Sequence, residues 1–136
     1  MANIPQKLKL EIVTPERLLI SEEVEEVTIP GSEGYLGILP GHLPLLTTIG
    51  AGVLSYHRSG QKYHLAACGG FAEVLGDRVI VVAETVERPG EIDVSRAQIA
   101  KDRSEKQLMS REQIDVEATM ASLLRATTRI KVAELR

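Results

Sequence analysis

Aromatic residues and cysteine are scarce in this sequence of 136 residues. It contains three tyrosines, one phenylalanine, no tryptophan and one cysteine, Cys68. Because proteins that bind single-stranded nucleic acid stack the bases on aromatic rings, so few rings argue against a nucleic-acid partner. A single cysteine excludes an internal disulfide, and its apolar neighbours predict a buried, inert thiol. The core must therefore be built from valine, isoleucine, leucine and alanine.

Long apolar segments are also missing. No run approaches the roughly 20 residues that a membrane-spanning helix needs. The first twelve residues, MANIPQKLKLEI, lack the apolar region of a signal peptide. We therefore expect the chain to reach a membrane only through partner proteins.

Acidic charge is in slight excess, and it is unevenly distributed. The net charge is −3, with 7 basic and 11 acidic side chains in residues 1–90 but 9 basic and 8 acidic ones in residues 91–136. A basic end predicts either an acidic partner or a bound anion, or simply a solvated helix face, and the charges alone do not decide between them.

Sequence motifs of the common catalytic sites are absent. There is no phosphate-binding G-x-x-x-x-G-K-[ST] loop, no G-x-G-x-x-G turn and no G-x-S-x-G elbow. His57 and His64 flank a predicted hairpin, but two imidazoles alone make a poor metal site. An enzyme that used His42 and Glu33 would need an orienting partner and oxyanion donors, which the sequence does not provide. We expect no catalytic site, no metal site and no required cofactor.

An acidic cluster surrounds Val24. It consists of Glu22, Glu23, Glu25 and Glu26. Such carboxylates bind hard cations in some proteins. The interpretation we favour is charge on an exposed strand edge, which discourages edge-to-edge association.

Short apolar segments separated by turn residues fill residues 1–87. Residues 8–13 alternate with a period of two, and Ser59-Gly60 and Gly76-Asp77 read as hairpin turns. Further strands are expected at residues 24–29, 35–39, 52–57, 62–67, 71–75 and 79–83. Strands this short, with turns every 8–12 residues, indicate an antiparallel β-sandwich or barrel.

The pattern changes after Pro89-Gly90. Asp93 is placed to cap a helix over residues 94–109, and Asp115 to cap a second helix that runs to about residue 135. A narrow apolar stripe follows the second helix: Val116, Met120, Leu123, Thr127 and Ile130. Residues 88–136 are therefore predicted to form an antiparallel two-helix hairpin, weakly stable alone.

Four segments, in order, resemble those of the epsilon subunit of bacterial rotary ATP synthases. They are the loop Gly31–Thr47 (GSEGYLGILPGHLPLLT), Gly69–Val74 (GGFAEV), Val79–Glu84 (VIVVAE) and Ile92–Ala97 (IDVSRA). The likeness runs from about residue 8 to residue 135. Four ordered motifs over a matching strand-then-helix layout are far more specific than one glycine-rich loop. A plastid homologue is the other source that this likeness allows.

The resemblance implies a non-catalytic subunit of the rotor. In that family the sandwich grips the gamma subunit and sits on the c ring, so that proton flow is coupled to ATP synthesis at the cytoplasmic side of the bacterial plasma membrane. By analogy, the residues that face the c ring are Ser32, Glu33, Gly34 and Tyr35. His42 lies nearer the gamma subunit. Tyr35 departs from the family pattern, which often has a polar or acidic residue at that position.

The resemblance also implies a regulatory hairpin. In bacterial relatives the hairpin folds onto the sandwich or extends into the catalytic alpha/beta head, where it blocks ATP hydrolysis, and in some of them ATP binds the folded form without being hydrolysed. The residues that match this ATP site are Glu87, Ile92, Asp93, Arg96, Arg103, Arg125 and Arg129.

The spacing of the arginines fits an anion site in part. Arg96 and Arg103 are seven residues apart and share a helix face, as do Arg125 and Arg129, which are four apart. Like charges so placed disfavour the helices unless an anion lies between them, and a triphosphate supplies one. The alternative is solvated arginines that pair with nearby carboxylates such as Asp102, Glu105 or Asp115.

One competing interpretation is a free-standing ATP-sensing module without a rotor. It needs the helical site but not the loop Gly31–His42. A tight, stoichiometric complex with a gamma subunit distinguishes the two.

Overall fold

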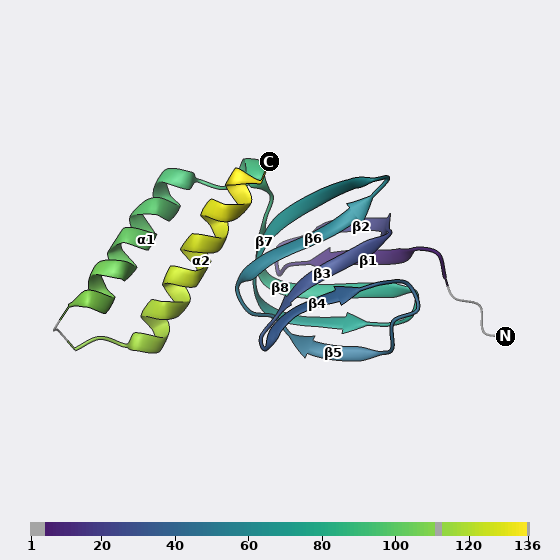
Figure 1. The fold of residues 1–136 in the computed structure, drawn as a ribbon, viewed down its shortest axis with the longest axis horizontal. Helices are drawn as coiled ribbons and strands as arrows, with labels where there is room; N and C mark the ends of the chain where they lie inside the picture. Colours follow the sequence, from purple (N-terminus) through teal and green to yellow (C-terminus); the bar gives the residue numbers. More distant parts are fainter. Residues whose placement is uncertain (1–4, 111–112, 136) are drawn as a thin grey trace.

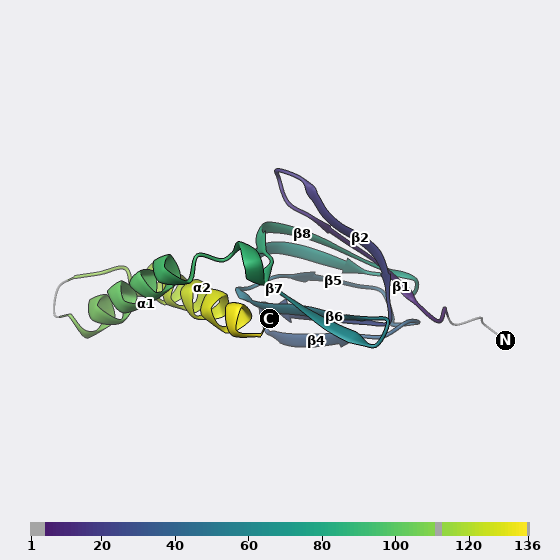
Figure 2. The same ribbon diagram turned by 90° about the horizontal axis from the view of Figure 1, so that it is seen from above.

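The fold is taken from a computed structural model that describes residues 5–110 and 113–135. These residues form eight strands, a short 3₁₀ turn and two helices (Figures 1 and 2). The elements are β1 (Leu8–Val13), β2 (Leu18–Val24), β3 (Glu26–Gly31), β4 (Gly34–Ile38), β5 (Leu45–Thr48), β6 (Gly52–Arg58), β7 (Gln61–Val74), β8 (Arg78–Glu87), η1 (Pro89–Glu91), α1 (Val94–Met109) and α2 (Val116–Glu134). The predicted β-sandwich with a C-terminal helical hairpin is confirmed.

The strands follow the order β2-β1-β8-β7-β6-β3-β4, and β5 pairs with β7. All of these pairs are antiparallel except β1 with β8, which is parallel. The 14-residue β7 joins the two layers, because its first half pairs with β6 and its second half with β5. It bends at Gly69 and Gly70, whose φ angles of 73° and 98° are costly for any residue but glycine.

Several strand predictions need correction. The predicted strand 24–29 is not one element, because Glu25 separates β2 from β3, and β3 continues through Pro30 to Gly31. Residues 62–67 and 71–75 belong mostly to the single strand β7. Strands β2 and β5 were not predicted. Polar residues interrupt the apolar pattern of β2, and β5 has only four residues, so neither gives a strong periodic signal.

Glu22 is a partly exposed and not a fully exposed charge of the edge strand β2. It pairs across the sheet with the fully buried Leu10, so its side chain points between the layers. There its Oε1 lies 2.6 Å from Arg58 Nη1, while its buried Oε2 has no hydrogen-bond partner among the described residues. Glu23 and Glu25 are exposed, as predicted. A charged side chain that points inward on an edge strand still discourages edge-to-edge association.

Both predicted helix caps are confirmed. The Asp93 side chain accepts a hydrogen bond from Arg96 N at 3.1 Å, and Asp115 accepts one from Ala118 N at 3.1 Å. The predicted apolar stripe of the second helix is not its buried face, because Val116 is 58% exposed and Met120 is 51% exposed. The buried side chains of the two helices are small, namely Ala97, Ser104, Thr119, Ala126, Thr128 and Val132. Small residues let the helix backbones approach closely.

The hairpin docks on one end of the sandwich through a small apolar cluster. Val132 of α2 is fully buried there against Ala66 and Ile92, with Val53 and Ala133 packed around them. Figures 1 and 2 show α2 beside the strands and α1 on its far side. This cluster is separate from the sandwich core, which lies between the two layers.

A polar clamp holds η1 against the sandwich. Glu91 accepts hydrogen bonds from Arg88 N at 3.0 Å and from Arg17 Nη2 at 2.9 Å. Arg88 Nη2 also donates to the backbone oxygen of Leu19 at 3.0 Å. These contacts lower the pKa of Glu91, first through the Arg88 N–H and then through the Arg17 side chain. The clamp joins segments about 70 residues apart, so local sequence does not reveal it.

We predict that Gly70→Ala destabilises the sandwich strongly. A Cβ at this position would lie 1.9 Å from the Val82 oxygen, and the residue has a φ of 98°. The expected loss of unfolding free energy is about 2–4 kcal/mol. The matched control is Gly60→Ala, which also has a positive φ but nothing within 4 Å of the added carbon, and there we expect only about 1 kcal/mol. Urea denaturation measures both, and equal losses would contradict the close approach.

We predict that Glu91 contributes to the acid sensitivity of the fold. Because the folded state lowers the pKa of this carboxyl, its contribution is present above the unfolded value, near about 4.3, and is lost as pH falls through the folded value. Glu91→Gln should therefore lower stability near pH 7 and match the wild type in strong acid. Urea denaturation from pH 7 to pH 3 tests this, and a difference between the two proteins that persists undiminished in acid would contradict it.

Candidate functional site

The predicted rotor-contact residues lie at the two ends of one strand. Ser32 and Glu33 form the turn before β4, Gly34 and Tyr35 begin β4, and His42 follows it in the next turn. The five residues of β4 span roughly 17 Å. Glu33 and His42 are therefore held apart, so an enzyme that pairs them has no geometric basis.

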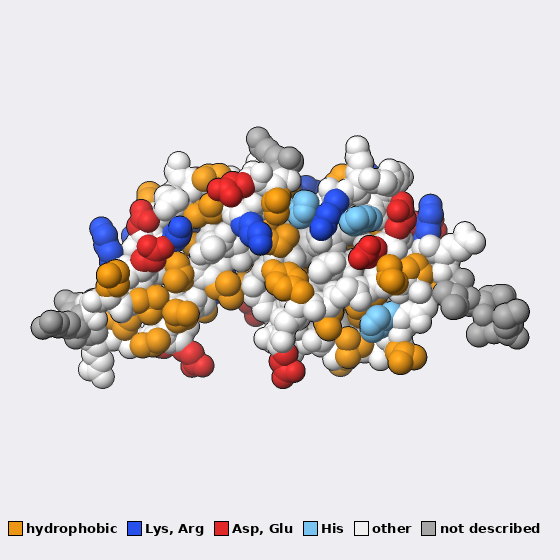
Figure 3. Space-filling view, viewed as in Figure 1, with side chains coloured by type: hydrophobic (Ala, Val, Ile, Leu, Met, Phe, Trp, Pro, Cys, Tyr) orange, Lys and Arg blue, Asp and Glu red, His pale blue; other side chains and the backbone are white. Residues whose placement is uncertain are grey.

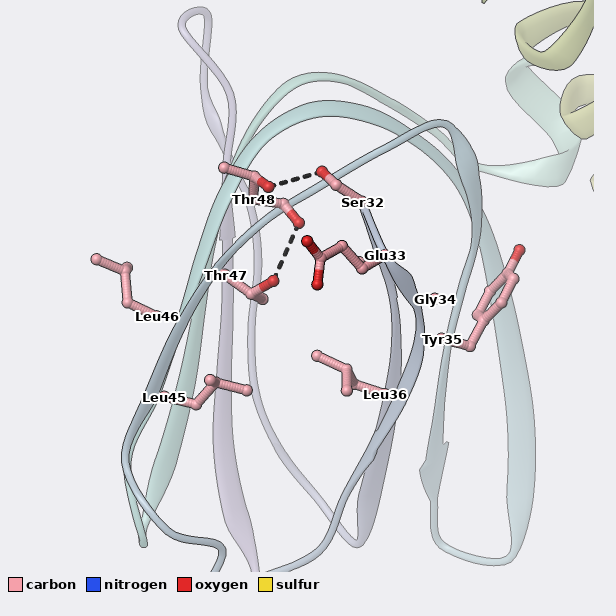
Figure 4. A pocket seen from close by; sticks show the side chains of 10 residues that line it. Ser32, Glu33, Gly34, Tyr35, Leu36, Leu45, Leu46, Thr47 and Thr48 are labelled. Atoms are coloured by element: carbon pink, nitrogen blue, oxygen red, sulfur yellow. Dashed lines mark hydrogen bonds between the residues drawn. The ribbon is translucent and has the colours of Figure 1, made fainter.

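The turn at Ser32 is anchored to β5. Ser32 N donates to the Thr48 oxygen at 3.0 Å, and the two hydroxyl oxygens of these residues lie 2.6 Å apart. Beside the turn is an open cavity of about 620 Å³ between β4 and β5. Figure 4 shows Leu36 and Leu45 directed toward each other in this cavity, with Glu33 projecting above them. The cavity thus has an apolar inner part and a polar mouth.

Tyr35 points away from that cavity and lies over β6 (Figure 4). Its hydroxyl accepts a hydrogen bond from Val53 N at 3.0 Å. The ring can approach because residue 52 is glycine: a Cβ there would lie 2.7 Å from the Tyr35 oxygen and 2.6 Å from Pro30 Cβ. Gly52 therefore supports this surface, although the sequence pattern gave no sign of that role.

His42 sits in a half-buried turn at the other end of β4. Its Nδ1 lies 2.6 Å from the Leu43 oxygen, and its backbone N donates to the Leu39 oxygen at 3.1 Å. The neighbouring Gly41 N donates to Gly76 at 2.8 Å, which ties this turn to the β7–β8 turn. Both leucines beside His42 are exposed.

The outer face of the layer formed by β5, β7, β8, β1 and β2 carries one apolar row. Phe71 faces Val82 across the β7–β8 pair, Val82 faces Val13, and Val13 faces Leu18. In the next row Leu46 and Ile80 alternate with Glu73 and Glu11. We call the first row, with Leu46 and Ile80, the outer apolar face. Leu46 is 68% exposed and Phe71 is 46% exposed, so the face is open. The sequence carried a signal for it, since an unbroken apolar run in β8 is typical of a strand covered on both sides.

A second candidate site is a groove between η1, α1 and the end of α2. It encloses about 340 Å³ and is lined by Glu87, Glu91, Asp93, Arg96, Ala97, Ala100 and Arg129. The structure therefore brings together four of the predicted ATP-site residues: Glu87, Asp93, Arg96 and Arg129. In the groove Arg129 Nε lies 2.5 Å from Glu87 Oε1.

The other three predicted residues lie outside this groove. Ile92 is buried in the cluster around Val132. Arg125 donates to Ser122 Oγ at 3.0 Å and lines a small adjoining cavity with Arg129. Arg103 is exposed, two helical turns beyond Arg96 on α1. The structure therefore gathers part of the predicted set.

The carboxylates that were candidates to neutralise the arginines have other partners. Asp102 accepts from Gln98 at 3.0 Å, Glu105 lies 3.8 Å from Lys101, and Asp115 caps α2. Arg96 and Arg103 have no side-chain hydrogen bond or ion pair to any residue that the structure describes. In the groove itself Arg129 is paired with Glu87, so Arg96 is the arginine there that stays unpaired, beside the carboxylates of Glu91 and Asp93.

The remaining polar candidates do not form a site. Cys68 is half-buried rather than buried as predicted, because it lies at the bend of β7 beside the small cavity under α2. His57 and His64 lie near each other on the β6–β7 pair, and burial, Lys62 and His57 lower the pKa of His64. Within the described ranges, no three His, Cys, Asp or Glu side chains are placed to hold a metal ion.

Neither α1 nor α2, nor any other helix in the described part of the chain, has the length and apolar character that a membrane crossing requires.

Comparison with known families identifies both halves of the chain. Residues 7–89 match the family model for the beta-sandwich domain of the ATP synthase delta/epsilon chain. Residues 91–134 match the model for the long alpha-helix domain of the same chain. The two matches meet at η1.

Curated relatives and solved structures agree with this assignment. ATP synthase epsilon chains from Solibacter usitatus and Desulforamulus reducens are 44% and 46% identical, over 96% and 93% of this chain and 98% and 96% of theirs. A chain in the mitochondrial ATP synthase of Euglena gracilis has the same fold, with a TM-score of 0.84 and 24% identity over 99% of this chain and 85% of its own. A chain from the central stalk and c ring of Tetrahymena thermophila has a TM-score of 0.62 and 14% identity over 98% of both chains. This chain therefore belongs to the family of ATP synthase epsilon chains, which are accessory and not catalytic subunits of the complex.

Proposed function

We propose that this epsilon chain is a rotor subunit that links the gamma subunit to the c ring and so couples proton translocation to ATP synthesis. It would act at the cytoplasmic side of the bacterial plasma membrane, held there by the complex. The titles of the solved structures that share its fold name the F1/c-ring and the central stalk/c-ring. The observation that carries the proposal is the outer apolar face.

The outer apolar face is the surface that we assign to the gamma subunit. A sandwich needs only its inner faces to be apolar, yet Phe71 and Leu46 are exposed on the outside. Contiguous exposed apolar patches mark interaction sites. Leu43, next to His42 in the turn before β5, is a further exposed apolar side chain, and this supports the assignment of His42 to the gamma side.

The exposed turn at Ser32–Tyr35 is the surface that we assign to the c ring. Its backbone is fixed by the hydrogen bonds to Thr48, so it presents a defined shape. Glu33 is exposed and has no ion pair among the described residues, and it would pair with a basic group on the ring. Tyr35 is fixed against Val53 and would supply an aromatic contact where relatives often have a polar one.

The hairpin would restrain ATP hydrolysis and bind ATP as a regulatory ligand. A triphosphate suits the groove because Arg96 and Arg129 line it, and Arg103 and Arg125 lie nearby. Guanidinium groups bind phosphate oxygens through paired hydrogen bonds. Asp93 uses one oxygen to cap α1, and its other oxygen would accept from the amino group of adenine.

The extended form of the hairpin would meet the alpha/beta head. The face of α2 that points away from the sandwich carries a shallow apolar cavity of about 380 Å³, lined by Met120, Ala121, Leu123, Leu124 and Thr127. Figure 3 shows apolar side chains gathered over the helices on one face of the molecule. Arg125 and Arg129 lie on the other side of α2, toward the sandwich, so an extended α2 would offer apolar contacts on one face and basic contacts on another. ATP would favour the docked form and the head the extended form, which is how two ligands shift one equilibrium.

The gamma assignment predicts that charge on the outer apolar face prevents assembly. Phe71→Glu and Leu46→Glu should each weaken the complex with the gamma subunit by about 10-fold or more, because a buried, unpaired carboxylate is costly. Co-purification of the two subunits and titration of labelled gamma subunit measure this effect.

Lys62→Glu is the control for these two variants, because it places the same charge on the β6–β7 hairpin, away from the outer apolar face. All three variants should unfold at similar urea concentrations. If the wild-type chain forms no stoichiometric complex with the gamma subunit, the rotor assignment fails and the free-standing ATP sensor is favoured.

The ATP assignment predicts a measurable heat of binding to the isolated chain. Arg129→Ala and Arg96→Ala should each weaken ATP binding by about 10-fold or more, since each removes a charge-assisted contact. Arg78→Ala is the matched control, because that residue pairs with its neighbour Asp77 on the sandwich. Absence of binding heat for the wild type at millimolar ATP would contradict the proposal.

A further inference from the structure

Two contacts near the C-terminal end of α2 hold the docked hairpin on the sandwich. One is the burial of Val132 against Ala66 and Ile92. The other is the ion pair between Arg129 and Glu87. We call these two contacts the latch. Because the remainder of the hairpin projects beyond the sandwich (Figures 1 and 2), breaking the latch frees both helices.

The clamp on η1 is built from other residues than the latch. Arg17 comes from the β1–β2 turn, Arg88 reaches the backbone of β2 at Leu19, and Glu91 joins the two arginines. No side chain of α1 or α2 takes part in these bonds. The turn itself is closed by Glu91 N donating to the Arg88 oxygen at 2.9 Å. Gly90, which composition would single out as the flexible point, lies inside this closed turn.

The first extended residues after the clamp are Ile92 and Asp93. Their φ and ψ angles are −80° and 126°, and −83° and 95°, and α1 starts at the next residue. We propose that the hairpin swings on Ile92–Asp93 as its pivot, with the latch opening while the clamp on η1 stays closed. This inference rests on the proposed function only in taking the hairpin to leave the sandwich.

A swing about this pivot separates the two sides of the groove. Glu87 and Glu91 stay with the sandwich when the hairpin swings, whereas Arg96 and Arg129 leave with the helices. The groove is therefore complete only in the docked form. A ligand that needs the complete groove would therefore favour the docked form.

The single cysteine is a built-in reporter of the latch. Cys68 is half-buried and lines the small cavity beneath α2 together with Thr128 and Arg129. Opening the latch removes those side chains, so the thiol should react faster with a bulky reagent. The amide exchange rate of Glu91, whose N–H closes the η1 turn, reports the clamp separately.

The test uses the isolated chain, without ATP or partner subunits. Val132→Ser should raise the rate of Cys68 modification by dithiobis(nitrobenzoate) by about 10-fold, because it removes the buried contact of the latch. It should leave amide exchange at Glu91 unchanged. Arg17→Ala should do the opposite, raising exchange at the Glu91 amide and leaving the thiol rate unchanged.

Two results would overturn the proposal. If Val132→Ser exposes the Glu91 amide together with Cys68, then η1 moves with the hairpin and the pivot lies before Pro89. If Val132→Ser leaves the thiol rate unchanged, Val132 is not part of the latch. Amide protection of the core strand residues Leu54 and Val81 verifies folding, and Glu87→Gln replaces Val132→Ser if that variant unfolds. Loss of ATP or gamma binding would leave these results intact, so the two proposals fail separately.

Discussion

The close approach of Gly70 to the Val82 carbonyl is the contact on which the rest of this architecture depends. It lets one 14-residue strand bend and serve both layers. One half of β7 then carries Ala66, where the hairpin docks, and the other half carries Phe71, on the outer apolar face. A residue with a Cβ at the bend would push the paired strands β7 and β8 apart. The two candidate interaction surfaces therefore share a single backbone constraint.

The sandwich core and the hairpin contact differ greatly in strength. The core contains a continuous set of fully buried Leu, Ile and Val side chains between the layers. The hairpin contact has one fully buried side chain, Val132, and one ion pair that is partly exposed to water. Burying a single valine contributes only about 1.5–3 kcal/mol, and a partly exposed ion pair contributes little. Because this contact is weak, one ligand or partner can shift the equilibrium between the docked and the released hairpin, while the sandwich stays intact.

Local features of the sequence predicted local features of the fold. Asp93 and Asp115 cap the helices as predicted, since capping depends on the next three residues, and the Ser59-Gly60 turn closes the β6–β7 hairpin. Features that depend on distant segments were missed or misassigned. The inward direction of Glu22 follows from its pairing with Leu10, and the exposed stripe on α2 follows from which face meets the sandwich. Neither the strand pair nor the buried face of the helix can be recognised from a short stretch of sequence.

The candidate sites divide in the same way. The family motifs located the Ser32–Tyr35 turn and the arginines, but the structure is needed to see that Arg96 and Arg129 line one groove while Arg103 lies beyond it. The clamp on η1 is the feature that amino-acid composition predicts least well. Pro89-Gly90 reads as a flexible junction, yet Arg17 and Arg88 fix Glu91 from distant parts of the sandwich. The flexible point is displaced to Ile92–Asp93, where α1 meets the groove. Movement of the hairpin and assembly of the groove therefore become one event.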